Sequence, residues 1–265
     1  MLKAILISLF FSLYLYASDI TFKIESDFPS QTPWVKTLLT QSVKNLNKMF
    51  LNENVLLPKQ ILVTIKKNIK IKGISANARR TNNSINFQSN VWQKDKYRIW
   101  IMIHELVNLL NSYYGCNGYP SDWWANGRSP YPEYISVLIM QKLGYKQEAL
   151  WRKNVHKDKN DHKFYWALDK QYGTVLFKKF FQLIKQYNIH LDKIGKPWPH
   201  PDKKRTLMTL SLLSIAANKN LANLATRYDI GKKPKDWEKR HPEIRFIPYS
   251  ITKEEIEFQI KTLSK

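Results

Sequence analysis

The apolar run at residues 99–110 constrains the fold most, because it carries polar side chains that are costly to bury. Its composition and length predict a helix over 97–114. His104 and Glu105 stand in the middle of the run, and Asn108 follows one helical turn later. A histidine and a carboxylate lose free energy in an apolar interior unless they find partners. The chain must therefore bring polar groups to this helix inside an otherwise apolar core.

The order His-Glu-x-x-Asn at residues 104–108 is similar to the zinc-binding helix motif His-Glu-x-x-His. In that motif two histidines four residues apart bind zinc, and the glutamate is the general base on the metal-bound water. Here Asn108 stands in the second histidine position, and an amide oxygen is a weak zinc donor. Two interpretations are open: a variant metal site, or a hydrogen-bonded polar strip through Asn111 that anchors the helix.

An aromatic loop rich in glycine and proline follows this helix. Trp123 and Trp124 are adjacent in it, and they can form a wall for a peptide or sugar ring, or fix the loop to the core. Arg128 can anchor a carboxylate or pair with a neighbouring acid. Glu133 opens the next predicted helix, as a metal ligand or as a charge that suits the helix dipole. Asp122 is an alternative oxygen ligand.

The remaining metal-binding residue types add little to this pattern. His156 and His162 are the nearest substitutes for a missing ligand, but they flank a Lys/Asp-rich stretch that is more typical of a solvated loop. Cys116 is the single cysteine, which excludes an internal disulfide and a zinc site made of cysteines.

Periodicity predicts an α+β fold, with a small mixed N-terminal part followed by an all-helical half. The predicted strands are 19–25, 60–66, 69–72 and 84–88. The predicted helices are 34–51, 97–114, 133–143, 164–172, 174–187, 204–217, 221–228 and, in the tail, 252–263. These elements are assigned to one domain, 18–265, with its β-containing part at about 18–95 and its helical part at about 96–265.

The N-terminus predicts export. Lys3 precedes an apolar run of residues 4–15, and Ala17 ends an imperfect small-residue cleavage site. Residues 1–17 are therefore expected to be a signal peptide, either cleaved or kept as an anchor, and the protein is expected in the periplasm or outside the cell. No later segment is apolar for long enough to span a membrane.

The formal net charge of +22 at pH 7 has two interpretations. It reflects either a compositional bias toward lysine or an attraction to anionic surfaces such as lipid headgroups and envelope polymers. The lysines are scattered, and no nucleic-acid module is present, so specific nucleic-acid binding is not expected.

The order of elements over residues 60–230 resembles the glutamate-zincin (gluzincin-like) metallopeptidase clan, and especially its basic secretory protein and enhancin-like groups. The similarity lies in a sequence of features: the Asn-containing strand 84–88, the His-Glu helix, the Gly/Pro loop, the acidic helix start, the helix with Phe164-Tyr165-Trp166 before Gly173, and the helix ending in Asn218.

That resemblance implies a zincin-like fold with zinc as cofactor. It implies His104 and Glu133 as zinc ligands, Asn108 in the remaining ligand position, and Glu105 as the general base. Trp123, Trp124 and Arg128 would shape the substrate cleft. The expected function is zinc-dependent hydrolysis of peptide or cell-envelope amide bonds. The alternatives are a catalytically degenerate binding protein on anionic envelope surfaces and a basic effector acting on host material.

Overall fold

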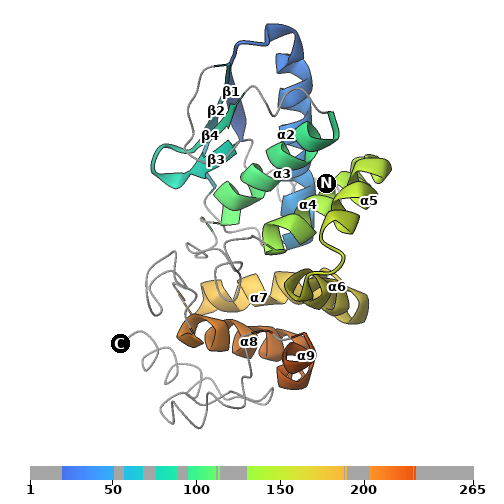
Figure 1. Cartoon of the computed structure of the whole chain (residues 1–265). Coiled ribbons are helices and arrows are strands. Elements are labelled where there is room, and N and C mark those ends of the chain that lie inside the picture. Colours follow the sequence, from blue (N-terminus) through green and yellow to red (C-terminus); the bar gives the residue numbers. More distant parts are fainter. Residues whose placement is uncertain are drawn as a thin grey trace, which may run out of the picture.

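A computed structural model describes residues 20–50, 57–67, 76–88, 95–111, 113, 130–187, 189, 203–228 and 230. Several predictions lie outside these residues: the signal peptide 1–17, the strand 69–72, Cys116, Asp122, Trp123, Trp124, Arg128 and the helix 252–263. The described part is a mixed α/β structure in which one small sheet is accompanied by a majority of helices (Figure 1).

The sheet has four strands in the order β1-β2-β4-β3. β1 (Thr21–Ser26), β2 (Gln60–Lys66) and β4 (Ser84–Gln88) are parallel, with Thr21 opposite Gln60 and Leu62 opposite Ser84. β3 (Ala76–Arg79) pairs antiparallel with β4. Within the described residues β3 has no partner on its other side, so it forms an edge of the sheet.

The two central strands are rich in apolar residues that are buried in the core. Ile61, Val63 and Ile65 of β2 and Ile85 and Phe87 of β4 are all fully buried. Such near-continuous burial is typical of parallel strands. The strands therefore supply the centre of the apolar core.

Helix α2 (Thr32–Phe50) follows the short 3-10 turn η1 (Pro29–Gln31) and packs against β1. Its apolar residues recur three or four positions apart, which places them on one face. The buried ones are Val35, Leu38, Leu39, Val43, Leu46, Met49 and Phe50. In Figure 1 α2 runs beside the sheet.

Helix α3 (Asp95–Asn111) packs against β3, α2, α4 and α5, and every residue from Ile99 to Asn111 is buried. Its C-terminal end lies near the sheet, where the Tyr113 hydroxyl donates a hydrogen bond to the Asn83 side chain. Asn83 has a φ of 48° in the turn before β4, a conformation that asparagine tolerates better than most residues. α3 is thus enclosed on several sides and fixed at its end.

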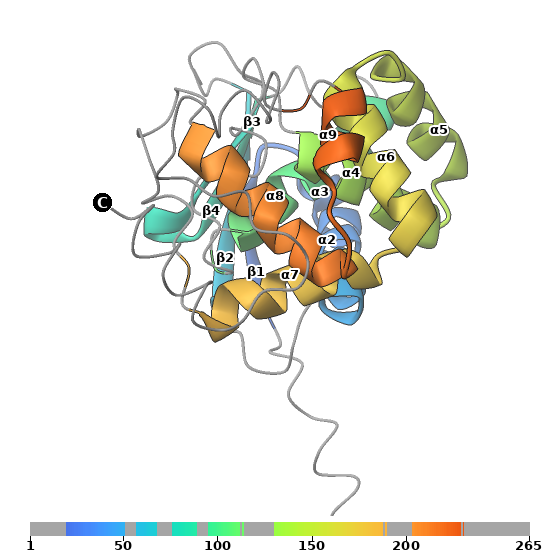
Figure 2. The ribbon, with the colours of Figure 1, turned by 90° about the horizontal axis from the view of Figure 1, so that it is seen from below.

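Six further helices complete the described part. They are α4 (Pro130–Lys142), α5 (Lys146–Val155), α6 (Asn160–Tyr172), α7 (Val175–Gln186), α8 (Lys203–Ala217) and α9 (Ala222–Arg227). α7 and α8 pack together below α3 and α4 in Figure 1, and Figure 2 shows α8 crossing the molecule from that side. Rings of Tyr131, Tyr134, Tyr165 and Phe177 join α4 to α6 and α7.

The structure adds two elements that the sequence did not predict. β3 has the sequence Ala-Asn-Ala-Arg, which lacks the branched and aromatic residues of a strand, and it forms through pairing with β4. α5 contains only two buried residues, Ala149 and Arg152, so it shows no apolar stripe.

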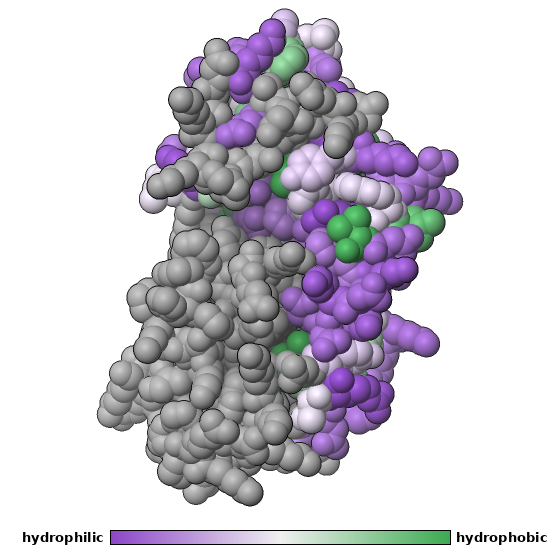
Figure 3. Space-filling model, viewed as in Figure 1, coloured by the Kyte–Doolittle hydropathy of each residue, from purple (hydrophilic) through white to green (hydrophobic). Residues whose placement is uncertain are grey.

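Where Figure 3 colours the surface of the described residues, it is mainly hydrophilic, with small apolar areas between. The exposed large hydrophobic residues of the described part are Leu150, Val155 and Val175. No helix among the described residues is long and apolar enough to cross a membrane.

Candidate functional site

The polar face of α3 is the starting point of the site. His104, Glu105, Asn108 and Asn111 recur at helical spacing, and their exposed fractions are 8, 7, 7 and 3 %. The surrounding positions of α3 are apolar and buried, so the helix as a whole is part of the core. Four polar side chains are therefore held in the interior, and the structure must account for each of them.

Glu133 lies beside this face, in the first turn of α4, and it is the most strongly bonded group of the site. Its carboxylate accepts hydrogen bonds from Trp100 Nε1 at 2.8 Å and from Arg152 Nε at 2.7 Å. A second guanidinium nitrogen of Arg152 donates to the other carboxylate oxygen. The Arg152 guanidinium also stacks 3.4 Å from the centre of the Trp100 ring. Helices α3, α4 and α5 each supply one member of this group.

The charges in this group compensate one another. Burial alone would raise the pKa of the Glu133 carboxyl, but the hydrogen bonds from Arg152 and the nearby positive charges outweigh burial and lower it. Glu133 is therefore a carboxylate at neutral pH, paired with a guanidinium that is always protonated. A planar fork on a carboxylate is the strongest common form of ion pair.

His104 is adjacent to Glu133 but is not hydrogen-bonded to it. Its Nδ1 lies 3.7 Å from Glu133 Oε1, and its ring centre lies 5.2 Å from that of Trp100. Burial lowers the pKa of His104 to about 4, more than the Glu133 carboxylate raises it. The imidazole is therefore neutral at pH 7. Its Nδ1 is buried with no hydrogen-bond partner among the described residues.

Glu105 faces the sheet edge. It accepts a hydrogen bond from Asn108 Nδ2 at 3.3 Å and another from the backbone of Ala78 in β3. Burial outweighs both bonds and raises the pKa of Glu105 to about 7. A carboxyl group that exchanges its proton near neutral pH has the property required of a general acid or base.

Two further side-chain atoms of α3 are buried without a hydrogen-bond partner in the part of the chain that the structure describes. They are Asn108 Oδ1 and Asn111 Nδ2, one an acceptor and the other a donor. Buried polar atoms are almost always hydrogen-bonded in native proteins, so an exception needs an explanation such as an absent water or ligand. Together with His104 Nδ1, these atoms form a row of unused hydrogen-bonding groups along one face of α3.

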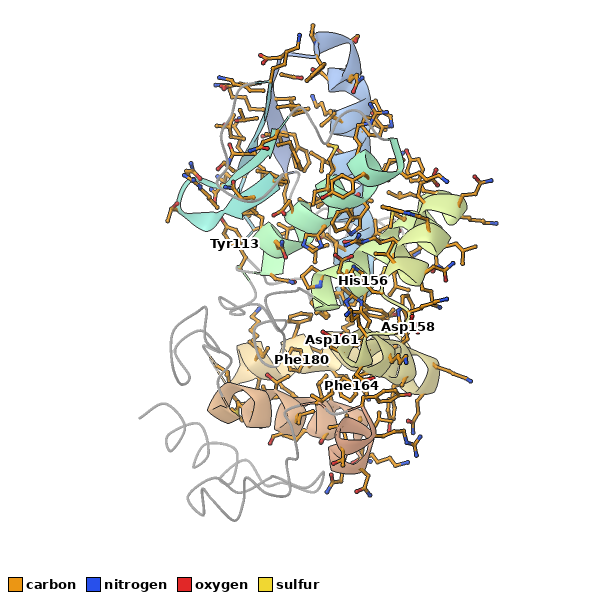
Figure 4. The ribbon with its side chains drawn as sticks, in the orientation of Figure 1. Tyr113, His156, Asp158, Asp161, Phe164 and Phe180 are labelled. Carbon is orange, nitrogen blue, oxygen red and sulfur yellow. The ribbon has the colours of Figure 1, made fainter. Side chains whose placement is uncertain are left out.

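His156 and His162 meet at the junction of α5 and α6. Their rings stack 4.5 Å apart, and His162 is buried. The Lys/Asp-rich stretch between them, residues 157–160, is exposed, as predicted for a solvated loop, whereas His156 is half-buried and His162 is buried. Figure 4 labels His156, Asp158 and Asp161 at this junction, and the charge of His156 acts on the pKa of Asp161. The charge of His156 also acts on the pKa values of His104 and Glu133.

The predicted ligand set fits zinc poorly as it is arranged. His104 and Glu133 lie together, but the Asn108 amide is bonded to Glu105, and Arg152 and Trp100 already hold the Glu133 carboxylate. No group of three or more His, Cys, Asp or Glu side chains in the described residues is arranged to hold a metal ion. Zinc therefore stays a prediction from the sequence.

The sequence missed two members of this site, Trp100 and Arg152. Trp100 precedes His104 by four residues, and this spacing places it on the same face of the helix. Arg152 gave no local signal, because one arginine in a lysine-rich helix is indistinguishable from a surface charge. The predicted substrate-binding residues Trp123, Trp124 and Arg128, and the alternative ligand Asp122, lie outside the described residues.

Comparisons with known proteins give no match: no family model, no curated protein and no solved structure is significantly similar to this chain. The functional argument therefore depends on the site itself.

Proposed function

We propose that this protein is an exported binding protein of zincin-like organisation, which recognises peptides or peptide-bearing polymers of the cell envelope at α3. One observation carries the proposal: α3, which packs beside the edge strand β3, holds three buried hydrogen-bonding atoms without a partner among the described residues, on His104, Asn108 and Asn111. A ligand must therefore enter the interior beside α3 to reach them. The helix thus places an acceptor and a donor beside a strand edge. Together they are complementary to the N–H and C=O groups of an extended peptide.

The spacing of the two asparagines supports a peptide ligand. Asn108 and Asn111 are three residues apart, so their side chains are neighbours on the helix. In an extended chain the N–H and C=O of one residue point to the same side. Asn108 Oδ1 can accept from such an N–H, and Asn111 Nδ2 can donate to such a C=O. A ligand of this kind would satisfy atoms that the protein leaves unpaired.

The net charge supports an anionic setting for this ligand. At +22 the chain is attracted to anionic envelope polymers and lipid surfaces, and this attraction is screened by salt. The predicted signal peptide, residues 1–17, would deliver the protein to the envelope. We therefore propose two contributions to binding: a salt-sensitive attraction of the surface and a salt-resistant recognition at α3.

Co-sedimentation of the mature chain, residues 18–265, with isolated peptidoglycan separates these two contributions. We expect Asn111→Ala to weaken the salt-resistant part about tenfold, the effect of one lost hydrogen bond. Asn45→Ala is the matched control, since Asn45 lies on α2 and bonds the Gln41 backbone. If binding disappears at high salt and Asn111→Ala does not change it, the binding is only a nonspecific electrostatic attraction. Absence of binding would refute the proposal.

Hydrolysis is the second candidate function, and the environment of Glu105 favours it. Burial raises the pKa of Glu105 to about 7, and His104 lies 3.7 Å from Glu133. For a peptidase we expect Glu105→Gln to abolish release of new amino groups from peptidoglycan or casein without unfolding the protein. Elemental analysis of the purified protein beside His104→Ala tests the zinc prediction directly. Near-stoichiometric zinc that the variant loses would favour the enzyme, and retained activity in Glu105→Gln would remove the assigned base.

A further inference from the structure

We infer that the Arg152 guanidinium is the resident cation of this site: it holds Glu133 in place of a metal ion and makes the His104–Glu133 pair a latent metal site. The inference concerns the same site as the proposed function but does not depend on peptide binding. A zinc titration therefore tests it without any peptide, so the two proposals can fail separately.

The contacts of Arg152 are those of a permanent partner. It donates to both carboxylate oxygens of Glu133, and its plane is covered by the Trp100 ring at 3.4 Å. Arg152 is 9 % exposed and Glu133 7 % exposed. A guanidinium offers its donors in a planar fork that matches the two oxygens of a carboxylate. The carboxylate is thus neutralised by a charge that the chain itself supplies.

This partner and a metal ion exclude each other at Glu133. A zinc ion bound by a carboxylate lies about 2.0–2.2 Å from its oxygen. Both oxygens of Glu133 already accept hydrogen bonds from Arg152, and one of them accepts another from the Trp100 indole. An ion added beside them would meet a like charge in a buried site, where electrostatic repulsion is poorly screened. Metal binding therefore requires Arg152 to leave the carboxylate.

Withdrawal of Arg152 would leave the Glu133 carboxylate next to the His104 imidazole. His104 Nδ1 is buried, has no hydrogen-bond partner among the described residues and lies 3.7 Å from Glu133 Oε1. An imidazole nitrogen and a carboxylate oxygen are both ligands that zinc accepts. These two side chains would be the ligands that the protein offers to the ion.

The test is zinc affinity, measured by competition with a chelating dye, for the wild type and Arg152→Gln. We expect the variant to bind zinc at least about tenfold more tightly, because a repelling charge has been removed and a carboxylate released. The gain should disappear when His104→Ala is added. Arg98→Gln is the matched control: it removes the same charge from another arginine that stacks on a tryptophan, Trp34, and should leave zinc affinity unchanged.

Arg152→Lys keeps the experiment decisive if Arg152→Gln does not fold. Lysine retains the charge but lacks the planar fork, so it holds a carboxylate less firmly. We expect its zinc affinity to lie between those of the wild type and Arg152→Gln. Zinc binding by the wild type as tight as that of the Arg152 variants, or no gain in any Arg152 variant, would overturn the inference.

Discussion

The sheet and the α3–α4–α5 junction are buried to the same degree but by different means. In the sheet, the side chains of Ile61, Ile85 and Phe87 are fully buried and purely apolar. At the junction, Glu133 and Arg152 are nearly as buried, yet they are charged and depend on each other. Side chains in the first region need only to pack well, whereas the charged side chains in the second need particular bonding partners. Burial alone therefore does not point to a functional site, whereas a buried charge with a specific partner identifies a candidate.

The two regions should also respond differently to mutation. An apolar side chain that is shortened loses contacts in proportion to the atoms removed. A buried ion pair that loses one member leaves the other charge without compensation, and this costs more than the pair itself contributes. The four predictions below use that difference, and their expected effects decrease from first to last.

Glu133→Ala should give the largest effect, because it leaves the Arg152 guanidinium buried without an acceptor. We expect the free energy of unfolding to fall by roughly 3–5 kcal/mol, measured by urea denaturation. The matched control replaces both partners, Glu133→Leu with Arg152→Met, and should be about as stable as the wild type. A loss below about 1 kcal/mol for Glu133→Ala would show that the ion pair is not buried as described.

The pH dependence of the free energy of unfolding tests the raised pKa of Glu105. Its pKa is about 7 in the folded protein, compared with 4.5 for an ordinary glutamate, so the folded state binds more protons between these pH values. The stabilising contribution is therefore fully present below about pH 4.5 and is lost as the pH rises through about 7. Across this range we expect the stability of the metal-free wild type to fall by on the order of 2–3 kcal/mol relative to Glu105→Gln.

The contribution of His104 to stability changes with pH in the opposite direction, so the comparison must remove it. Its pKa is lowered to about 4 from 6.5, so its contribution is present above pH 6.5 and is lost as the pH falls. The difference between the wild type and Glu105→Gln removes this shared term. Parallel stability curves for the two proteins would contradict a raised pKa for Glu105.

Trp100→Phe removes the indole donor to Glu133 but keeps an aromatic ring beneath Arg152. A hydrogen bond to a charged group contributes roughly 1.5–3 kcal/mol, and we expect a loss near the lower end, about 1.5–2 kcal/mol, by chemical denaturation. Trp34→Phe is the control, because Trp34 stacks under a different arginine, Arg98. Equal losses in the two variants would assign the effect to ring size and not to the Glu133 hydrogen bond.

Ile85→Val tests the other side of the comparison and should have the smallest effect. One methylene is removed from a fully buried residue of β4, which costs about 0.5–1.5 kcal/mol. We expect zinc affinity and peptidoglycan binding to be unchanged. A change in either would mean that the sheet and the junction are not energetically separate.

The regular elements were largely predictable from the sequence. The predicted strands 60–66 and 84–88 coincide with β2 and β4, and the predicted helix 204–217 differs from α8 by one residue. Branched apolar residues in the strands and helical apolar spacing in α8 carried this information locally. β3 and α5 lack such a pattern, since β3 depends on pairing with β4 and α5 on Arg152 reaching the interior.

The site was predictable only in part, for a related reason. His104, Glu105 and Asn108 share one helix, so their proximity follows from helical spacing. Glu133 was placed near them only through the resemblance to a family, and the structure brings it to 3.7 Å from His104. Arg152, nineteen residues further along the chain, depends on how α5 returns toward α3. Contacts between helices that are distant in sequence leave no periodic signal.

The Glu133 carboxylate is bonded from two other helices at once, by Trp100 of α3 and by Arg152 of α5. Any ligand that competes for this carboxylate must therefore weaken the attachment of α5, whose end carries His156 against His162 of α6. Thermodynamic linkage requires the converse, so a partner that moves α5 would change ligand affinity at α3 by the same factor. One shared acceptor thus couples α3, α4 and α5, so a displacement of α5 would be felt at the Glu133 carboxylate.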